Sequence, residues 1–324
     1  MKIKLFRSAT LGIITKDYKL LTDPWLTDGE YYGSWSHFPS YNLEKHLDEI
    51  NSYNGIYISH IHPDHASEQT LKKINKSIPI YIHKYHAPFL KLKLENLGFR
   101  VIEIENGKTL KLNNDLDITI YSADNCNPQL CYKFLGCGNF FVKDGSQQID
   151  SLAVIKDKDH TILNTNDCPF ELSQEVLKII KKKFYKIDVL LTGYGGAGPY
   201  PQCIDNFNEK EKKAEANKKK ISFLNKTIEF LKIVKPKYYL PFAGTYTLSG
   251  KLSTLQEFRG VPSVDEAYQF IDDKIKKEKT INFIKPIKIN PDNVFDIKKD
   301  KSEFPYIRLN KEDQKNYILK NLSK

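Results

Sequence analysis

The sequence predicts an α/β layered fold, and three observations lead to this prediction. Short runs rich in β-branched and aromatic residues alternate with longer helical stretches along most of the chain. No internal repeat or low-complexity linker divides the 324 residues, which are enough to bury a sizeable core. Apolar residues make up 40% and charged residues 28%, as in an ordinary globular protein. We expect one domain over residues 1–280 and a charged, peripheral C-terminal extension over residues 281–324.

The expected elements alternate along the chain. A short strand over residues 55–59 is dense in β-branched and aromatic residues, so we expect it to be buried. Ser67 can cap the helix that follows, and Pro236 ends a long helix. The other strands are predicted at residues 2–6, 11–15, 19–21, 80–82, 101–104, 109–112, 116–121, 140–142, 152–155, 161–163, 189–192 and 238–240. Helices are predicted at residues 67–74, 87–96, 173–183, 208–234 and 264–277.

Charge and cysteine content exclude several classes of protein. The net charge is +10, but the lysines between residues 210 and 220 alternate with glutamates as on a solvated helix face, so no nucleic-acid partner is implied. No stretch has the apolar length of a secretory signal or a membrane span, so we expect a cytoplasmic protein with no membrane partner. Five cysteines, an odd number, favour reduced thiols over a disulfide framework.

A cluster of possible metal ligands directly follows the buried strand at 55–59. Side chains alternate along an extended segment, so His60 and His62 point the same way and can converge on one ion. Pro63 turns the chain, which lets Asp64 and His65 face a second ion. The cluster predicts one or two divalent metal ions, zinc or iron, that could activate water, polarise a substrate oxygen or, with iron, bind dioxygen. Three of the eight histidines lie within these six residues, which makes a chance grouping a poor explanation.

The motif His60-Ile61-His62-Pro63-Asp64-His65 at a strand end resembles the signature of the metallo-β-lactamase superfamily. The resemblance implies a four-layer αββα sandwich over residues 1 to about 280. It also matches Asp23 to an early acidic loop of such proteins. A further implication is that Asp167, which follows Asn166 at a strand end, bridges both metals.

Two departures from the usual hydrolase pattern affect the expected metal centre. No histidine lies in residues 144–151, where the superfamily supplies another ligand; Asp150 is the best substitute, and Gln147 or Gln148 a poorer one. Ala243 stands where the final histidine is expected. The loss of two imidazoles favours a weaker second site or a more oxygen-rich centre suited to iron or manganese. Three other histidines are not expected to be principal ligands: His83 and His86 could line the rim of the pocket or pack locally, and His160 is expected to be solvated in a turn.

Four short segments outside the histidine motif indicate one particular branch of the superfamily. They resemble the metallo-β-lactamase-like part of cytidine-monophosphate N-acetylneuraminate hydroxylases and their bacterial relatives, and they lie at residues 23–26, 166–168, 193–203 and 241–244. Those hydroxylases also carry a Rieske domain, whose paired Cys-x-His motifs are absent from this sequence. An oxygenase would therefore need a separate electron-transfer protein. The resemblance suggests a sugar nucleotide or another small anionic substrate.

Several residues in loops after predicted strands could bind that substrate. Tyr194 and Tyr200 lie in a loop rich in glycine and proline and could stack on a base or sugar, although an ordinary turn explains the loop equally well. Lys251 and Arg259 could hold a phosphate, unless they are simply solvated. Three aromatic residues are also candidates for the pocket: Trp25, Trp35 and Tyr246.

The leading hypothesis is a metal-dependent hydrolase of a small anionic substrate, such as a sugar nucleotide, a sugar phosphate or a lactone. In this hypothesis a metal-bound hydroxide attacks the substrate, and Asp64 also accepts a proton. The first alternative is a non-haem iron oxygenase that hydroxylates a sugar nucleotide. The second alternative is a degenerate, metal-poor binding protein.

Overall fold

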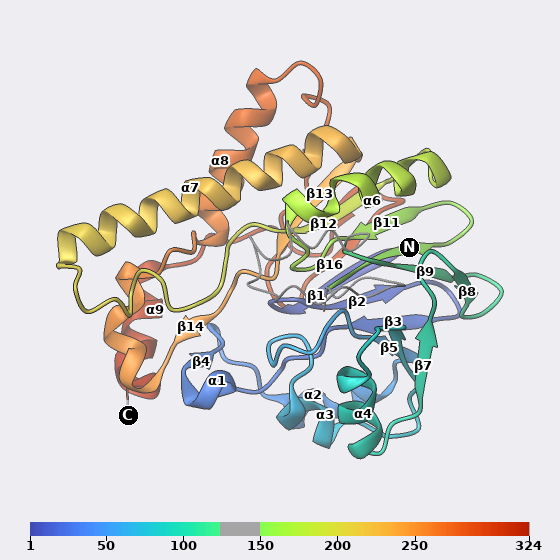
Figure 1. Cartoon of the computed structure of the whole chain (residues 1–324), viewed down its shortest axis with the longest axis horizontal. Helices are drawn as coiled ribbons and strands as arrows, with labels where there is room; N and C mark the ends of the chain where they lie inside the picture. The colour runs from blue at the N-terminus through green and yellow to red at the C-terminus, as the bar shows by residue number, and fades with distance from the viewer. Residues whose placement is uncertain (124–149, 324) are drawn as a thin grey trace.

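Two β-sheets pack face to face, and helices cover the outer face of each sheet (Figure 1). The structure is a computed structural model and describes residues 1–123 and 150–323. The αββα sandwich predicted from the sequence is confirmed. Layered α/β folds of this kind place their ligands at the strand ends.

The first sheet has the strand order β17-β16-β1-β2-β3-β5-β6-β7 in the described residues. Its antiparallel part consists of the N-terminal meander and the late strands β16 and β17. Strands β3, β5, β6 and β7 run parallel, so their carboxyl ends share one edge. The strands from the first half of the chain are β1 (Lys2–Arg7), β2 (Thr10–Ile14), β3 (Lys19–Thr22), β5 (Gly55–Tyr57), β6 (Ile80–His83) and β7 (Val101–Ile104).

The second sheet has the order β15-β13-β12-β11-β10-β9-β8 in the described residues. Strands β11, β12, β13 and β15 are parallel, and β8, β9 and β10 add an antiparallel part. The strands are β8 (Thr109–Lys111), β9 (Asp117–Ser122), β10 (Ser151–Lys156), β11 (Thr161–Asn164), β12 (Val189–Gly193) and β13 (Tyr238–Phe242), with β15 at one edge. The expected strand at 140–142 lies outside the described residues.

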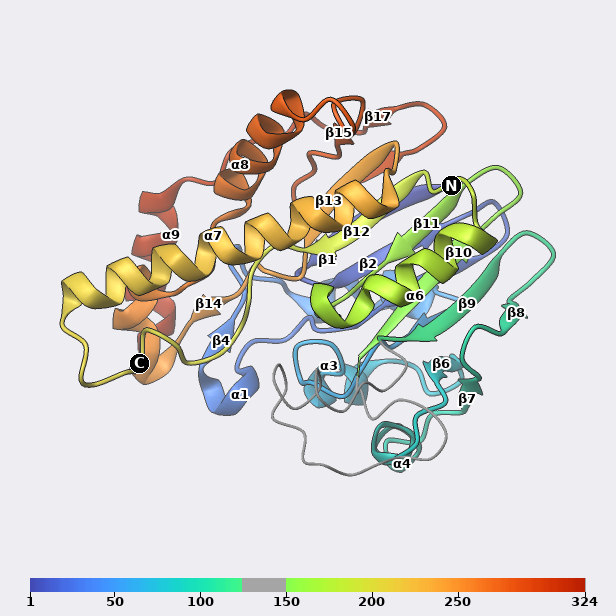
Figure 2. The same ribbon diagram turned by 45° about the horizontal axis from the view of Figure 1, so that its top comes forward.

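Apolar helix faces cover the sheets because each helix turns one stripe of side chains inward. Helices α2 (Leu43–Asn51), α3 (Glu68–Lys73) and α4 (Phe89–Asn96) pack on the first sheet. Helices α6 (Phe170–Lys183), α7 (Glu209–Val234) and α8 (Val264–Lys277) pack on the second sheet, as Figure 2 shows. Side-chain caps set several of the described helix starts; for example, Ser67 accepts from the amide of Thr70, and Asn208 and Ser263 each form a capping box.

The segment after residue 280 contributes to both sheets. Strand β15 (Lys285–Pro286) pairs with β13, and β16 (Val294–Asp296) pairs with β1 and with β17 (Lys301–Ser302). These three strands lie after residue 280, where the sequence analysis expected the domain to end. Helix α9 (Lys311–Tyr317) follows them. Among the described residues, no helix combines the length and apolarity that a membrane span requires.

Several short elements that the sequence pattern did not predict lie at one end of the sandwich. Helix α1 (Glu30–Gly33) leads into β4 (Trp35–Ser36), which pairs with β14 (Thr247–Leu248). The 3₁₀ helix η1 (Gly250–Phe258) follows β14. The β4–β14 pair brings an early and a late part of the chain together at one end of the sandwich (Figure 1).

Candidate metal centre

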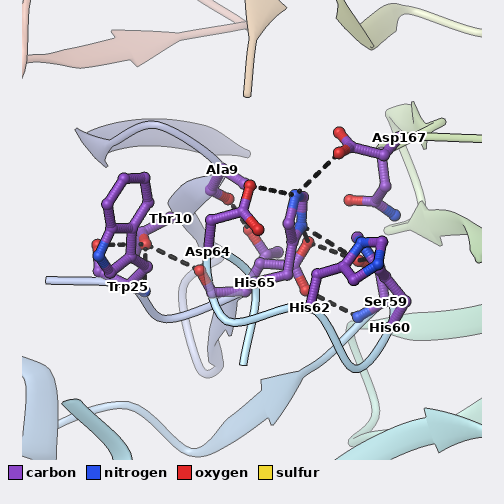
Figure 3. Close-up of polar contacts among 12 residues, drawn as sticks. Ala9, Thr10, Trp25, Ser59, His60, His62, Asp64, His65 and Asp167 are labelled. Atoms are coloured by element: carbon purple, nitrogen blue, oxygen red, sulfur yellow. Dashed lines mark hydrogen bonds and ion pairs between the residues drawn. The ribbon is translucent and has the colours of Figure 1, made fainter. Parts of the chain in front are cut away.

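The candidate ligands lie where strands of both sheets end. His60, His62, Asp64 and His65 follow β5, and Asp167 follows the neighbouring sheet's β11. Asp23 follows β3, which pairs directly with β5. Because the carboxyl ends of parallel strands share an edge, residues far apart in the sequence meet there (Figure 3).

His60 and His62 face each other at the start of the cluster. Nε2 of His60 lies 2.9 Å from Nδ1 of His62, so both imidazoles present a nitrogen to the same point. His60 is fully buried, and burial lowers its pKa well below the ordinary value, with repulsion from His65 and His62 adding to this effect. His60 is therefore a neutral imidazole, which is the form that binds metals.

His65 faces two carboxylates. Its Nε2 lies 3.4 Å from Oδ2 of Asp167 and 3.7 Å from Oδ2 of Asp64, which come from opposite sides of the cluster (Figure 3). One ligand atom each of His60, His65 and Asp167 also lies within 4.8 Å of the other two, which is the spacing of groups around one shared cation. His60, His65 and Asp167 thus converge on one position, with His62 against His60 and Asp64 against His65.

Asp23 and Ser59 orient the imidazoles from behind. Both carboxylate oxygens of the fully buried Asp23 accept hydrogen bonds from Ser59, one from its backbone amide at 2.7 Å and one from its hydroxyl at 2.8 Å. Asp23 also accepts from Nδ1 of His65 at 2.9 Å. Since the Ser59 hydroxyl donates to Asp23, its oxygen accepts from Nδ1 of His60, 2.9 Å away. The His60 ring is thereby held with Nε2 unprotonated and directed toward His62, and the Nδ1 bond of His65 turns its Nε2 toward Asp64 and Asp167.

The electrostatics of the cluster favour a cation. Burial alone would lower the pKa of His65, but Asp167, Asp23 and Asp64 together hold it well above the usual value. Burial and then Asp167 raise the pKa of Asp64, although His65 offsets part of this effect. Burial and then Asp167 also raise the pKa of Asp150 to about 7. Buried carboxylates that resist ionisation beside one another would be stabilised by a divalent ion, so these residues fit a metal.

Asp150 approaches the cluster from the start of β10. Its side chain is buried, and Oδ1 lies 3.5 Å from Nδ1 of His60 and makes no hydrogen bond. This oxygen faces the same His60 nitrogen that binds Ser59, so Asp150 lies behind His60 in this geometry, and its role as a substitute ligand stays a prediction. The weaker candidates Gln147 and Gln148 lie outside the described residues.

The chain around Asp167 is fixed by hydrogen bonds. Asn166 has a left-handed backbone with φ of 46°, and its amide side chain donates to the carbonyl of Ser151 at 3.0 Å. The Ser151 hydroxyl in turn donates to the carbonyl of Ser59 at 2.8 Å. These bonds tie the loop after β11 to the loop after β5. Asp167 is held in place beside His65, with its own side chain still 32% exposed.

The other candidate positions lie apart from the cluster. Ala243 packs at the edge of the core between the sheets, and its amide donates to the carbonyl of Ser8. His83 is buried, and burial lowers its pKa to about 4. His86 is exposed, and His160 pairs with Asp157 in the β10–β11 turn. None of these three histidines contacts the cluster in the described part of the chain.

A pocket of about 460 Å³ opens beside the cluster. His62, Asp64 and Asp167 form its polar wall, and Trp35 is one of its apolar walls. The remaining lining residues come from α1, the loop after β12, β14 and η1: Tyr31, Ser34, Ala197, Gly198, Pro199, Gln202, Cys203, Leu248 and Leu252. A substrate there would lie between the candidate ligands and an apolar surface.

Tyr31 is a pocket residue that the sequence analysis missed. Its hydroxyl donates to Oδ1 of Asp64 at 2.6 Å. Tyr31 and Tyr32 have left-handed backbone angles, with φ of 51° and 60°, between Gly29 and Gly33. This unusual turn directs the Tyr31 side chain inward. The signal in the sequence was the pair of glycines flanking two tyrosines, which marks an irregular backbone.

The predicted substrate residues are placed in four different environments. Trp35 lines the pocket, and Tyr246 stacks on it with ring centroids 3.7 Å apart. Trp25 is fully buried in the core, and Tyr200 binds Glu215 on the surface, so neither lines the pocket. Three further candidates also lie away from it: Lys251 is exposed, whereas Tyr194 and Arg259 are buried around a separate cavity.

Comparisons with known proteins support the fold and the resemblance. No family model matches the chain. The chain is 27% identical over 256 residues to the cytidine monophosphate-N-acetylneuraminic acid hydroxylase of Asterias rubens, and 26% identical over 248 residues to that of Danio rerio. These matches cover 76% and 74% of this chain but only 35% and 37% of the relatives. A Rieske 2Fe-2S iron-sulfur protein of Mycolicibacterium smegmatis is 27% identical, with 44% of its length covered.

Three solved structures are similar over about nine-tenths of the chain. An isothiocyanate hydrolase from Delia radicum gut bacteria superposes with a TM-score of 0.58 at 14% identity, covering 91% of this chain and 99% of the other. CmlA, a diiron β-hydroxylase from Streptomyces venezuelae, gives a TM-score of 0.53 at 14% identity, covering 88% of this chain and 52% of the other. A metallo-β-lactamase fold protein from Bacillus subtilis, YhfI, gives 0.50 at 13% identity, covering 91% and 99%. At such identities the likeness is one of fold.

Proposed function

Because the chain has the metallo-β-lactamase fold and resembles the hydroxylases in sequence, we propose that it is a metal-dependent enzyme acting on a small substrate in the 460 Å³ pocket. The observation that carries this proposal is the convergence of three imidazoles and three carboxylates at the ends of strands from both sheets. The proposed ligands are His60, His62, Asp64, His65, Asp167 and Asp150.

The reaction we favour is hydrolysis of a small anionic substrate, such as a sugar phosphate, a sugar nucleotide or a lactone. One or two divalent metals held there would supply a Lewis acid and lower the pKa of a coordinated water. Asp64 lines the pocket with Oδ1 bound to Tyr31 and Oδ2 directed toward His65, so it is placed to accept a proton. Trp35 offers a flat apolar surface for a ring of the substrate.

Charge within the pocket affects the choice of substrate. Its described lining contains Asp64 and Asp167 but no lysine or arginine. In this proposal the metal itself therefore attracts the substrate's anionic group, and the protein supplies the shape. Metal-free protein is accordingly expected to bind such a substrate weakly.

Hydroxylation by an iron centre is the second candidate function. It is favoured by the hydroxylase relatives and by Asp150, a carboxylate where an imidazole is usual, since oxygen ligands shift the preference from zinc toward iron. The matched relatives are more than twice as long as the matched region, so their substrate comes to this chain only as a proposal. An oxygenase of this kind would also use a separate electron-transfer protein.

Elemental analysis of protein purified without chelators or added metal tests these proposals. Zinc with oxygen-independent turnover supports hydrolysis, whereas stoichiometric iron with reductant-dependent oxygen uptake supports hydroxylation. Asp167→Ala is measured in the test for hydrolysis and in the test for hydroxylation, and it should remove metal and turnover together. Metal-free wild-type protein whose unfolding temperature does not change on adding zinc or iron would contradict both and favour a binding protein.

A further inference from the structure

A second, smaller cavity lies behind the apolar wall of the metal pocket. Its volume is about 100 Å³, and Tyr246 lines it. Tyr246 stacks almost parallel on Trp35, at an interplanar angle of 11°, and Trp35 lines the metal pocket. The two stacked rings therefore lie between the two spaces. We call the smaller space the Arg259 cavity.

Arg259 is the buried charge that lines this cavity. Its side chain follows η1, is only 8% exposed, and lies over the Tyr246 ring with the guanidinium carbon 4.4 Å from the ring centroid. Nε and Nη1 make no hydrogen bond, and no carboxylate in the described residues forms an ion pair with Arg259. Glu266 acts on it only from a distance, because the Glu266 carboxylate pairs with Lys220 and Lys311. A buried guanidinium in this state is costly unless an anion joins it.

The remaining polar groups of the cavity also suit an anion. The buried Tyr194 hydroxyl lines the cavity and has no hydrogen-bond partner. Arg7 lines it as a second positive charge, although that side chain already pairs with Asp292. The described lining includes no aspartate or glutamate that could compete for these donors. Positive charge and unused donors therefore meet at one place with no opposing acid.

The size of the cavity limits what can bind. A cavity of about 100 Å³ has room for a small tetrahedral ion of five heavy atoms. We propose that the Arg259 cavity binds one small inorganic oxyanion of the phosphate or sulfate type, held by the Arg259 guanidinium and the Tyr194 hydroxyl. Bidentate contact with an oxyanion is the geometry that an arginine side chain favours.

This proposal goes beyond the proposed function and does not depend on it. A bound oxyanion would fix Arg259 and thus the Tyr246 ring stacked beneath it, and through that ring it would hold Trp35 in the wall of the metal pocket. The occupant is then a structural ion that stabilises the pocket wall, whatever reaction the metal centre performs.

The test is thermal unfolding of the full chain in increasing inorganic phosphate or sulfate, with chloride at equal ionic strength as reference. The wild type should gain about 2–4 °C beyond chloride at saturating phosphate. Arg259→Met keeps the apolar stem of the side chain and should lose this gain. Any rise in unfolding temperature that phosphate still causes in Arg259→Met measures the general effect of salt exclusion from the protein surface. The matched control is Arg308→Met, since Arg308 is exposed, and it should keep the gain.

Asp167→Ala separates this site from the metal centre, because it removes a candidate metal ligand and should leave the phosphate gain intact. Tyr194→Phe removes one donor without a charge and should weaken phosphate binding by about tenfold, which serves if Arg259→Met does not fold. The proposal is overturned if phosphate acts no differently from chloride on the wild type. It is equally overturned if Arg259→Met keeps the full gain, or if Asp167→Ala abolishes it.

Discussion

Nδ1 of His65 donates a hydrogen bond to the buried carboxylate of Asp23 across 2.9 Å, and this bond fixes which nitrogen of His65 faces the candidate metal centre. The same carboxylate accepts from the amide and hydroxyl of Ser59. One acid outside the ligand set therefore orients His65 directly and His60 through Ser59. Metal-binding histidines commonly depend on such partners for their affinity.

Asp23→Asn is accordingly predicted to lower metal affinity by about 10–100-fold. The amide cannot accept as many hydrogen bonds as the carboxylate, so the tautomer of His65 is no longer fixed. Competition with a chromophoric chelator measures the change. Asp17→Asn is the matched control, because Asp17 is an exposed acid in the turn before β3. Equal affinity in the wild type and Asp23→Asn would show that Asp23 does not orient the ligands.

Tyr31→Phe is predicted to lower metal affinity by about tenfold or less. The change removes the 2.6 Å hydrogen bond to Asp64 and keeps the ring that lines the pocket. Tyr32→Phe provides a control in the same left-handed turn, because the Tyr32 side chain is fully exposed. The same titration is used for both variants. If the two variants behave alike, the hydroxyl of Tyr31 has no part in holding Asp64.

Much of this site could be predicted from the sequence because it depends on local geometry. The alternation of side chains after the strand at residues 55–59 predicts that His60 and His62 face one point, and the structure places their ring nitrogens 2.9 Å apart. Asp150 and Asp167 were singled out by the resemblance to the metallo-β-lactamase superfamily, and each lies next to a strand, β10 or β11, that the sequence pattern predicted. Strand ends are the places that such a pattern fixes best.

The parts that could not be predicted depend on tertiary contacts. Lys251 lies in the first turn of the 3₁₀ helix η1 and Arg259 directly follows that helix, yet Lys251 is exposed and Arg259 is buried. The directions of these two side chains depend on the pairing of β14 with β4, which no local sequence pattern predicts. Trp25 and Trp35 looked alike in sequence, but Trp25 is completely buried, and its amide is bonded to the Thr10 hydroxyl. Tyr31 reaches Asp64 only because of a left-handed turn.

Asp150→His tests whether the carboxylate determines the metal. Replacing an oxygen ligand with an imidazole is predicted to raise the ratio of bound zinc to bound iron relative to the wild type. Protein purified from cells grown with both metals is analysed for its metal content. Asp150→Asn keeps an oxygen but removes the charge, and it should lower total metal without raising the share of zinc. An unchanged ratio in Asp150→His would place Asp150 outside the ligand set.

Asp167→Ala is predicted to abolish stoichiometric metal binding. Asp167 is the group that reaches the His65 cluster from the second sheet, so its loss separates the two halves of the site. Metal content and the rise in unfolding temperature on adding metal should both disappear. Asp159→Ala is the control, since Asp159 is an exposed acid in the β10–β11 turn. Full metal content in Asp167→Ala would contradict the proposed bridging position.

The last prediction concerns pH and His37, which lines the Arg259 cavity. Burial, and then the positive charge of Arg7, lower the pKa of His37 to about 3 in the folded protein, against 6.5 in the unfolded chain. Between these two values the unfolded chain binds a proton that the folded protein does not. The free energy of unfolding should therefore fall as the pH decreases from about 6.5 toward 3, by up to about 1.4 kcal/mol per pH unit from this residue.

His37→Gln should remove this part of the acid sensitivity. The quantity to compare is the change in unfolding free energy between pH 7 and pH 4.5, measured by denaturant titration with a chelator present so that metal release does not contribute. His46→Gln is the control, because the His46 side chain is 42% exposed. Buffers must be free of phosphate and sulfate, since an oxyanion in the cavity would favour protonated His37 and shrink the difference. If His37→Gln loses as much stability as the wild type on acidification, His37 does not resist protonation in the folded protein.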